Sequence, residues 1–440
     1  MAHEETRKPD DALARTIGVA AALFLMTASF ILLKTGRDAL YFQGRGLLDL
    51  PKAYIGIAIL SLPAAAIVLG SIKIFGARLA RVGVPLFAAA LLAAFFPFAR
   101  PGGGPLMTSF FMLVPLAFGV LFSLTWLLAA ELLDGVGHRQ LARSYSIVGA
   151  ASILGGVAGG AVARIAAALV EPRFFIPAGA VLLLASTITV AIAQHRFPAR
   201  PLPRATGPLT PGPSNFLTVL RVRYSILLVF VGMLSSLVGI LIEFQFYLYA
   251  ATSGNETRAN ASYFANAYLL LNGVALIVQV VLMPRLQRLV GVHGSLMILP
   301  GALLAGAALL LASASVGMRS LLRVIEGGLK SSIHRSNWEQ AYLPLGRSHR
   351  VVAKLLVDGA AARVAEGIAA LSLYAWLRVS LGMDESSIVG SDTSWVTYLL
   401  ILTIAAWILM TRALGRDLVP ASTDVTGGAD MFPEIPLPDT

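Results

Sequence analysis

The chain has 440 residues, of which 57% are hydrophobic and only 13% are charged. This balance excludes an ordinary soluble domain and is typical of an integral membrane protein. Because there is no cysteine, disulfides and thiolate metal sites are excluded as well. The net charge of +11 is compatible with nucleic-acid binding, but its distribution along the chain favours another explanation.

Apolar stretches long enough to cross a bilayer recur along the whole chain. The polar segment 1–16 leads into the first stretch without a small-residue cleavage site, which favours a cytoplasmic lead-in over a cleaved signal peptide. We predict an all-α membrane protein of about twelve transmembrane helices. The predicted spans lie near residues 17–40, 53–75, 82–98, 106–133, 144–170, 174–194, 224–251, 263–284, 292–314, 316–342, 350–380 and 393–414. Charged residues interrupt 316–342 and 350–380.

Basic residues gather in alternate loops between the predicted spans. The cationic positions are Arg7, Lys8, Arg15, Lys73, Arg78, Arg81, Arg139, Arg143, Arg196, Arg200, Arg204, Arg221, Arg223, Arg285, Arg288, Arg347, Arg350, Arg412 and Arg416. The intervening loops carry few basic residues, and the loop with Asp384, Glu385 and Asp392 is acidic. This is the positive-inside pattern, so we expect both termini in the cytoplasm, a bacterial inner membrane and no nucleic-acid partner.

Two sequence echoes indicate an internal duplication. The string RLARVGV, starting at Arg78, recurs as RLQRLVGV, starting at Arg285. Glu131 followed by GHRQLAR recurs as Glu339 followed by GRSHR at nearly the same offset. Two six-helix repeats around a long central loop are the layout of major-facilitator-type transporters, with substrate bound between the halves.

The expected domains follow from this duplication. A segment rich in Pro, Gly and Arg separates the two predicted bundles, as is typical of a linker, and the C-terminal residues have a composition typical of disorder. The predicted parts are a cytoplasmic segment 1–16, a bundle 17–194, a cytoplasmic linker 195–223, a bundle 224–414 and a disordered cytoplasmic tail 415–440.

The end of the first predicted helix carries Lys34, Arg37 and Asp38. Lys34 and Asp38 lie four residues apart on one helix face, so one interpretation is a local ion pair with an Arg37 that reaches the interface. In the other interpretation Asp38 holds Arg37 toward a cavity, opposite Glu243 of the seventh helix. Glu243 has no basic residue within helical reach, so it needs a partner from another helix or a proton.

Charges in the tenth and eleventh predicted spans follow helical spacing. Arg319, Arg323, Glu326 and Lys330 form one stripe, and the further expected pairs are Arg335–Glu339, Lys354–Asp358 and Arg363–Glu366. For the glycine-rich run 155–160 we expect close helix packing, because a phosphate-binding loop would need a strand before it.

Signatures of catalysis are missing from the sequence. The six histidines are scattered and have no metal-ligand spacing, and there is no nucleophile elbow and no Walker motif. We therefore expect no enzymatic activity, no cofactor and no metal site.

Several of these segments resemble the ATP/ADP antiporters of plastids and intracellular bacteria. The string LLKTGRDAL is similar to that family's I-L-R-D-T-K-D-x-L pattern, and ILIE, ending at Glu243, is similar to its N-L-V-E motif. The segment ending at Glu131 resembles its F-A-N-E-I-T region. The strings KSSIHRSNWEQAYLPL and VAKLLVD resemble its K-Y-S-x-x-D-P-x-K-E-x-A-Y-I-P-L and G-K-A-x-x-D stretches.

The resemblance implies a secondary transporter that exchanges nucleotides or other phosphorylated anions across a lipid bilayer by alternating access. The candidate substrate-binding residues are Lys34, Arg37, Glu131, Glu243, Lys330, Arg335 and Lys354. The candidate gating or ion-pair residues are Asp38, Glu339 and Asp358. Two alternatives remain: a proton-coupled carrier of another solute, in which Glu243 or Asp358 binds the proton, and a membrane protein without transport activity.

Overall fold

The computed structural model describes most of the chain. The described residues are 9–43, 46–101, 104–133, 138–197, 220–252, 257–313, 315–342, 344–345, 353–381 and 394–423. These residues are almost entirely helical and include no strand, which confirms the predicted all-α class. Residues 1–8, most of the expected linker, the acidic loop and the tail from 424 onward lie outside the described residues.

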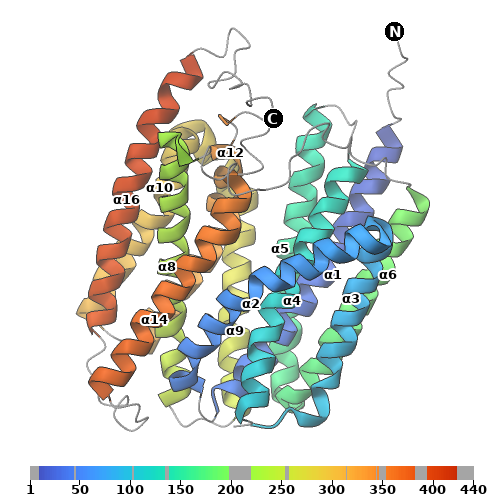
Figure 1. Ribbon diagram of the computed structural model, residues 1–440, viewed down its shortest axis with the longest axis horizontal. Helices are drawn as coiled ribbons and strands as arrows, with labels where there is room; N and C mark the ends of the chain where they lie inside the picture. The colour runs from blue at the N-terminus through green and yellow to red at the C-terminus, as the bar shows by residue number, and fades with distance from the viewer. Residues whose placement is uncertain are drawn as a thin grey trace, which may run out of the picture. The chain divides into compact units, whose positions relative to one another are not determined.

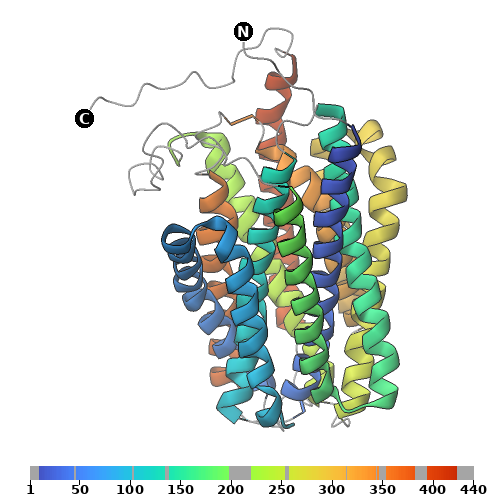
Figure 2. The same ribbon diagram turned by 90° about the vertical axis from the view of Figure 1, so that its right-hand side faces the viewer.

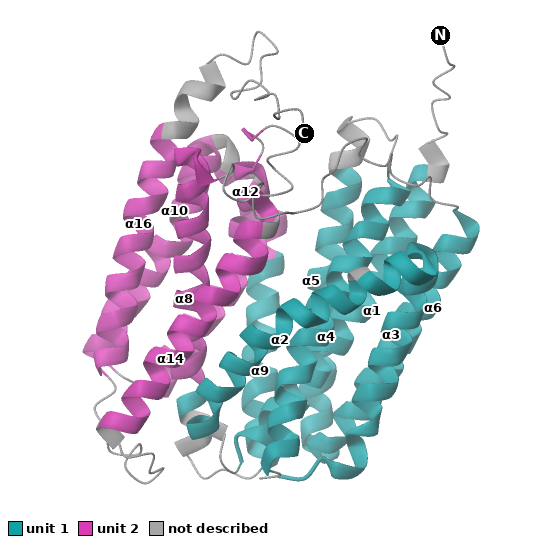
Figure 3. Cartoon of the chain, viewed as in Figure 1, with its two compact units in different colours: residues 1–204, 247–276 teal, residues 205–246, 277–440 magenta. Residues whose placement is uncertain are grey.

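The chain divides into two compact units, coloured separately in Figure 3. Unit 1 comprises residues 1–204 and 247–276, and unit 2 comprises residues 205–246 and 277–440. The helices of unit 1 are α1 (Pro9–Tyr41), α2 (Gly46–Phe75), α3 (Ala77–Ala94), η1 (Phe96–Phe98), α4 (Gly104–Leu132), α5 (His138–Leu169), η2 (Pro172–Phe174), α6 (Phe175–Arg196) and α9 (Thr257–Ile277). The long helix α8 (Arg223–Thr252) contributes to both units, and the unit boundary falls at Tyr247.

The remaining helices belong to unit 2, and Figure 1 labels α10, α12, α14 and α16 among them. They are η3 (Val278–Leu282), α10 (Met283–Ala312), α11 (Val316–Leu329), η4 (Lys330–His334), α12 (Arg335–Ala341), η5 (Leu355–Ala361), α14 (Ala362–Leu381) and α16 (Ser394–Thr423). The segments η3, η4 and η5 are π-helical, a rare form that is frequent at functional sites. The helix α10 is kinked at Gly291, whose φ of 66° is readily adopted only by glycine.

Ten described helices are long and apolar enough to cross a membrane. They match the predicted spans except for 316–342 and 350–380. The first of these is divided by η4, and the described part of the second, from residue 353 onward, contains η5 and α14. Two helix ends also differ from the prediction, because α1 begins at Pro9 and α16 continues to Thr423. The charge content of 316–342 and 350–380 is the physical reason that these two segments fall short of an apolar span.

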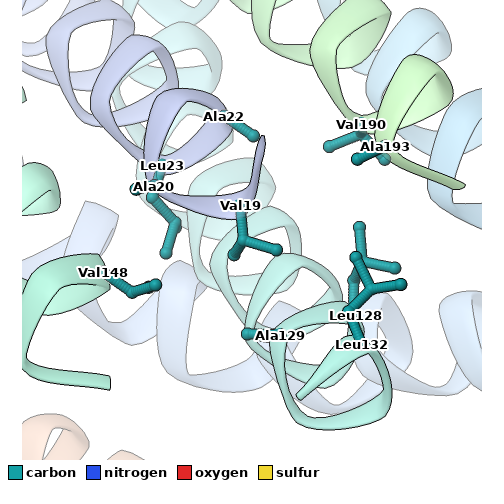
Figure 4. Close-up of a cluster of buried hydrophobic side chains, with 10 residues drawn as sticks. All are labelled: Val19, Ala20, Ala22, Leu23, Leu128, Ala129, Leu132, Val148, Val190 and Ala193. Carbon is teal, nitrogen blue, oxygen red and sulfur yellow. The ribbon is translucent and has the colours of Figure 1, made fainter. Parts of the chain in front are cut away.

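Helix α1 forms the centre of unit 1. It packs against α4, α5 and α6, and these helices run lengthwise beside one another in both views (Figures 1 and 2). Figure 4 shows the buried cluster that joins them. Its members come from α1, α4, α5 and α6 and are Val19, Ala20, Ala22, Leu23, Leu128, Ala129, Leu132, Val148, Val190 and Ala193.

Other helices present apolar side chains outward. In the most apolar window of α1, 61% of residues are buried, compared with 6% in α2. Large side chains such as Ile67, Ile74 and Phe75 of α2 are more than half exposed. Exposed apolar surface of this extent is unfavourable in water and indicates contact with lipid. The protein is therefore a multi-pass membrane protein.

The glycine-rich run in α5 packs against two helices, which confirms the packing interpretation. A Cβ on Gly155 or Gly159 would lie 2.1 Å from Phe24 O or 2.6 Å from Ala28 O of α1. A Cβ on Gly160 would lie 2.9 Å from the Cα of Leu269 in α9. Only glycine permits both approaches, so this run brings α9 into unit 1. The predicted six-helix bundles place α9 in the second half, and their assignment as domains stays a prediction.

Candidate functional site

The C-terminal end of α1 carries a buried ion pair. Arg37 and Asp38 are 3% and 0% exposed, and Arg37 Nε donates to Asp38 Oδ1 over 2.6 Å. Arg37 also donates to the backbone oxygen of Phe111 in α4 at 3.2 Å, and its guanidinium lies 4.0 Å from the Phe111 ring centroid. Asp38 therefore orients Arg37, as one of the two interpretations of this sequence required.

Two tyrosines complete the coordination of Asp38. Tyr268 of α9 and Tyr247 of α8 donate their hydroxyls to Asp38 Oδ2 over 2.5 Å and 3.0 Å. The Arg37 guanidinium in turn donates to the Tyr247 hydroxyl at 3.4 Å. A buried carboxylate is costly unless its lone pairs accept hydrogen bonds, and here both oxygens accept them.

Lys34 lies on the same end of α1. Its Nζ is 4.9 Å from the ring centroid of Tyr268, a cation–π distance. Lys34, Arg37 and Asp38 together carry two positive charges and one negative charge, a formal sum of +1. Stacked or edge-on aromatic rings surround this group, and they belong to Tyr41, Phe42, Phe111, Tyr247, Phe264 and Tyr268.

Glu131 lies elsewhere in unit 1. It forms an ion pair with the buried Arg81 of α3, close to the point where Arg15 donates to the backbone oxygen of Leu132. Arg37 contacts α4 at Phe111, and the helical rise between Phe111 and Glu131 amounts to about 30 Å. The structure therefore does not bring Glu131 and Arg37 together, and a shared site stays a prediction. Glu131 joins α3 to α4 at the end of the unit where the basic loops lie.

In unit 2, Glu243 receives its partner from another helix. Arg323 of α11 donates to Glu243 Oε1 over 2.9 Å and also pairs with Glu326, which confirms the predicted i,i+3 pair. Lys330, at the start of η4, lies 3.2 Å from Glu326 and 3.5 Å from the backbone oxygen of Ser235 in α8. Glu326 therefore forms ion pairs with two cations, Arg323 and Lys330. The predicted approach of Arg37 to Glu243 joins residues of different units and stays a prediction.

A second charge cluster of unit 2 surrounds Glu339 in α12. Arg335 lies 3.2 Å from Glu339 Oε1, as the spacing predicted, and Lys354 pairs with Glu339 Oε2. The side chains of Arg335, Glu339 and Lys354 are 60%, 39% and 42% exposed, so solvent reaches all three. Nearby, the Tyr224 hydroxyl of α8 donates to the backbone oxygen of Ala341, which places this cluster toward the basic N-terminal end of α8.

The predicted pair of Lys354 with Asp358 is replaced by other contacts. Asp358 Oδ1 accepts from Trp338 Nε1 and from the Tyr342 hydroxyl, both at 3.0 Å. Lys354 instead lies 5.9 Å from the Tyr342 ring centroid while it pairs with Glu339. The reason is that α12 supplies both neutral donors for Asp358 and an acidic partner for Lys354. Within the described residues, Asp358 has no cation within ion-pair distance.

The two clusters of unit 2 lie at different depths. Glu243 of α8 belongs to the first cluster and Tyr224 of α8 contacts α12 beside the second, and the helical rise between these two residues is about 28 Å.

Arg363 and Glu366 of α14 also form their predicted pair, at 2.5 Å. In the part of the chain that the structure describes, no group of three or more His, Cys, Asp or Glu side chains is placed to hold a metal ion.

The sequence did not single out Tyr247 or Tyr268, nor the pairing of Arg81 with Glu131. The tyrosines lie in apolar helices where aromatic residues are common, so no local signal marked them. For Arg81 a signal existed, because RLARVGV and the Glu131 segment are both among the echoed strings. Both strings recur in the second half of the chain, which is consistent with a contact between the Arg81 segment and the Glu131 segment.

Long apolar helices with ion-paired buried charges are the features of an all-α membrane protein. Solved structures share this fold over nearly the whole chain. A nucleoside transporter, NupG, aligns with a TM-score of 0.61 at 12% identity, covering 91% of this chain and 98% of its own. The POT family transporter PepTSo aligns with a TM-score of 0.63 at 12% identity, covering 93% and 99%.

A bacterial homologue of the human lysosomal transporter Spinster aligns with a TM-score of 0.53 at 14% identity, covering 93% of this chain and 99% of its own. The sequence matches no family profile and no curated relative. At these identities the comparisons establish only that the chain shares the fold of these transporters.

Proposed function

We propose that this protein exchanges phosphorylated anions, with nucleotides of the ATP and ADP type as substrates, across the membrane by alternating access. The observation that carries this proposal is the solvent-accessible triad of Arg335, Glu339 and Lys354. Two cations share one carboxylate, so the triad has a formal charge of +1.

The energetics of the triad favour replacement of Glu339 by a substrate. A solvent-exposed ion pair contributes only about 0–1 kcal/mol, because water screens it and the side chains lose freedom. A phosphate carries more charge and more acceptor oxygens than Glu339, so it can form charge-assisted hydrogen bonds with Lys354 and Arg335 at the same time. The exchange of partners is therefore favourable for an anion of more than one charge.

The residues of the resemblance gather at this same place, which further supports the proposal. Lys354 pairs with Glu339 and lies beside the ring of Tyr342, whose hydroxyl contacts Asp358. All four belong to the strings that resemble the ATP/ADP antiporters. Exchange follows if pairs such as Lys354–Glu339 and Arg37–Asp38 stabilise the empty carrier and bound phosphates replace them before the carrier changes state.

Orientation is part of the proposal. The basic loops favour a bacterial inner membrane with both termini in the cytoplasm. The Glu339 triad lies toward the basic end of α8, so it would meet nucleotides that arrive from the cytoplasm.

The test is uptake of labelled ATP by proteoliposomes loaded with unlabelled ADP. We expect Lys354→Ala and Arg37→Ala to reduce exchange at least tenfold, as the loss of one charge-assisted contact implies. Arg378→Ala is the matched control, because Arg378 is exposed on α14 and donates a hydrogen bond to Tyr374 of the same helix. Exchange that is unchanged in both site variants contradicts the site assignment.

The contacts of Asp358 favour a second candidate function, that of a proton-coupled carrier of another solute. In this candidate function we propose Asp358 as the proton carrier, since it accepts hydrogen bonds only from neutral donors and has no cation within ion-pair distance among the described residues. Glu243 is the weaker candidate for this role because Arg323 pairs with it. Uptake driven by a pH gradient, lost in Asp358→Asn and retained in Asp49→Asn, would favour this alternative.

A further inference from the structure

Unit 1 contains a cavity of about 480 Å³ at the C-terminal end of α1. Its lining combines the end of α1, the segment after η1, η2 and the start of α9, which all belong to unit 1 (Figure 3). The polar residues that line it are Gln43, Glu171, Arg173, Thr257 and Arg258. Small-molecule sites have volumes of roughly 300–1,000 Å³, so the cavity is large enough for a small organic ligand.

The apolar part of the lining is held by close packing of α1 on η2. Leu40 and Pro172 both line the cavity, and both are buried. One turn before Leu40, a Cβ on Gly36 would lie 2.9 Å from the backbone oxygen of Pro172. Only glycine permits this approach of α1 to η2. The cavity therefore has an apolar wall whose position is fixed by backbone contacts.

Two arginines and one glutamate contribute the charge of the lining. Arg173 Nε lies 2.8 Å from Glu171 Oε2, and these side chains are 46% and 55% exposed. A solvent-exposed pair of this kind contributes little to stability, so Arg173 can exchange Glu171 for a stronger partner. Arg258 is exposed as well and forms no ion pair with another described residue. The described lining thus carries two positive charges and one negative charge, a formal sum of +1, which favours an anionic ligand.

We propose that this cavity binds a small organic phosphate. Arg173 and Arg258 bind the phosphate group, and the apolar wall contacts the organic part. A guanidinium presents a fork of N–H donors that matches phosphate, and the oxygens of one phosphate can accept from two arginines. A bare inorganic ion would leave the apolar wall without a contact, so an organic ligand fits the lining better. The inference goes beyond the proposed exchange, because the Glu339 triad belongs to unit 2.

Protection of a single thiol tests whether the cavity is occupied. Because the chain has no cysteine, Gln43→Cys or Thr257→Cys places a sole thiol in the lining. In the purified full-length protein, saturating ADP should slow the reaction of either thiol with a maleimide about tenfold, since ligand cavities enclose most of the ligand surface. Adenosine, which lacks the phosphates, should leave the rate unchanged, and so should ADP for the control Arg78→Cys. Absence of protection at both lining positions overturns the site, and equal protection by adenosine overturns the role of the phosphate.

Two further substitutions separate this cavity from the Glu339 triad. In the Gln43→Cys protein, Arg258→Gln should raise the ADP concentration for half-protection about tenfold, because a charge-assisted contact is lost. Lys354→Ala and the charge control Arg378→Gln should leave that concentration unchanged. Protection that is lost in Lys354→Ala and kept in Arg258→Gln would place ADP at the triad and overturn this inference. Protection that depends on Arg258 supports it even in a protein that exchanges no nucleotide, so the two proposals fail separately.

Discussion

Carboxylates shared between two cations recur in unit 2. Glu326 contacts Arg323 and Lys330, and Glu339 contacts Arg335 and Lys354. A shared carboxylate weakens each of its pairs, because one negative charge cannot neutralise two positive ones. At the residue scale, this arrangement keeps cations available to a ligand while it limits their mutual repulsion.

Removal of the shared carboxylate at Glu339 tests this idea. In Glu339→Gln the two cations lose their partner, so we expect KM for ATP to fall several-fold. The maximal exchange rate should fall too, because nothing replaces the departing phosphate. Asp49→Asn, which removes the partner of Lys52, serves as the control. A higher KM in Glu339→Gln would show that Glu339 itself helps to bind the substrate.

For the pair of Arg81 with Glu131 we predict the opposite outcome, a loss of stability without a change in KM. Loss of one partner leaves a buried charge, which costs about 3–5 kcal/mol, so Glu131→Gln should lower the unfolding temperature. The KM of the remaining folded protein should stay unchanged, because Glu131 lies far from Arg37 along α4. Restoration of stability in Glu131→Arg combined with Arg81→Glu would support this role, and a raised KM with normal stability would contradict it.

Local spacing predicted some pairs of this protein and missed others. Arg323–Glu326, Arg335–Glu339 and Arg363–Glu366 follow from helical periodicity, since both partners lie on one helix face. Lys354 and Asp358 have the same spacing, yet each finds a partner in α12. Contacts across helices depend on tertiary packing, and a single sequence records that packing only weakly.

At the scale of elements, the glycines of α5 determine which helices meet. Gly155 and Gly159 face α1, whereas Gly156 and Gly160 face α9. Both contacts were predictable in kind from the run of small residues, but the identity of the partner helices was not. The π-helical segments η4 and η5 were not predicted either, because a π-bulge has no simple sequence signature.

Substitution of one of these glycines tests the packing. In Gly155→Ala the new Cβ would lie 2.1 Å from Phe24 O, so α1 and α5 must move apart. We expect a loss of about 1–3 kcal/mol in stability, measured as a lower unfolding temperature in detergent. Gly149→Ala on the same helix meets nothing within 4 Å and should be neutral or slightly stabilising. Equal stability of the two variants would show that the α1–α5 approach is looser than described.

At the scale of the whole molecule, apolar length alone predicted the all-α class and ten of the spans. The two remaining segments are helical but too charged to satisfy the same criterion. Their charges are also the ones that form the Glu326 and Glu339 clusters. The sequence therefore predicted the fold most poorly where the candidate site lies, since a polar site violates the pattern of a lipid-spanning helix.

The expected orientation is testable because the chain has no cysteine. A cysteine at position 78 near the start of α3, or at position 173 in η2, would be the sole thiol, and Arg78 and Arg173 are both exposed. In intact cells an impermeant maleimide should label Arg173→Cys directly and Arg78→Cys only after permeabilisation. The reverse pattern would place the basic loops outside the cell.

The most direct measurement compares labelled ATP uptake in two sets of vesicles that contain the purified protein. One set is loaded with ADP at equal pH, and the other is empty and has an imposed pH gradient. An exchanger of phosphorylated anions takes up label only in the ADP-loaded vesicles, and Lys354→Ala abolishes that uptake. Uptake in the empty vesicles that follows the pH gradient, with no stimulation by internal ADP, would contradict exchange and favour the proton-coupled carrier.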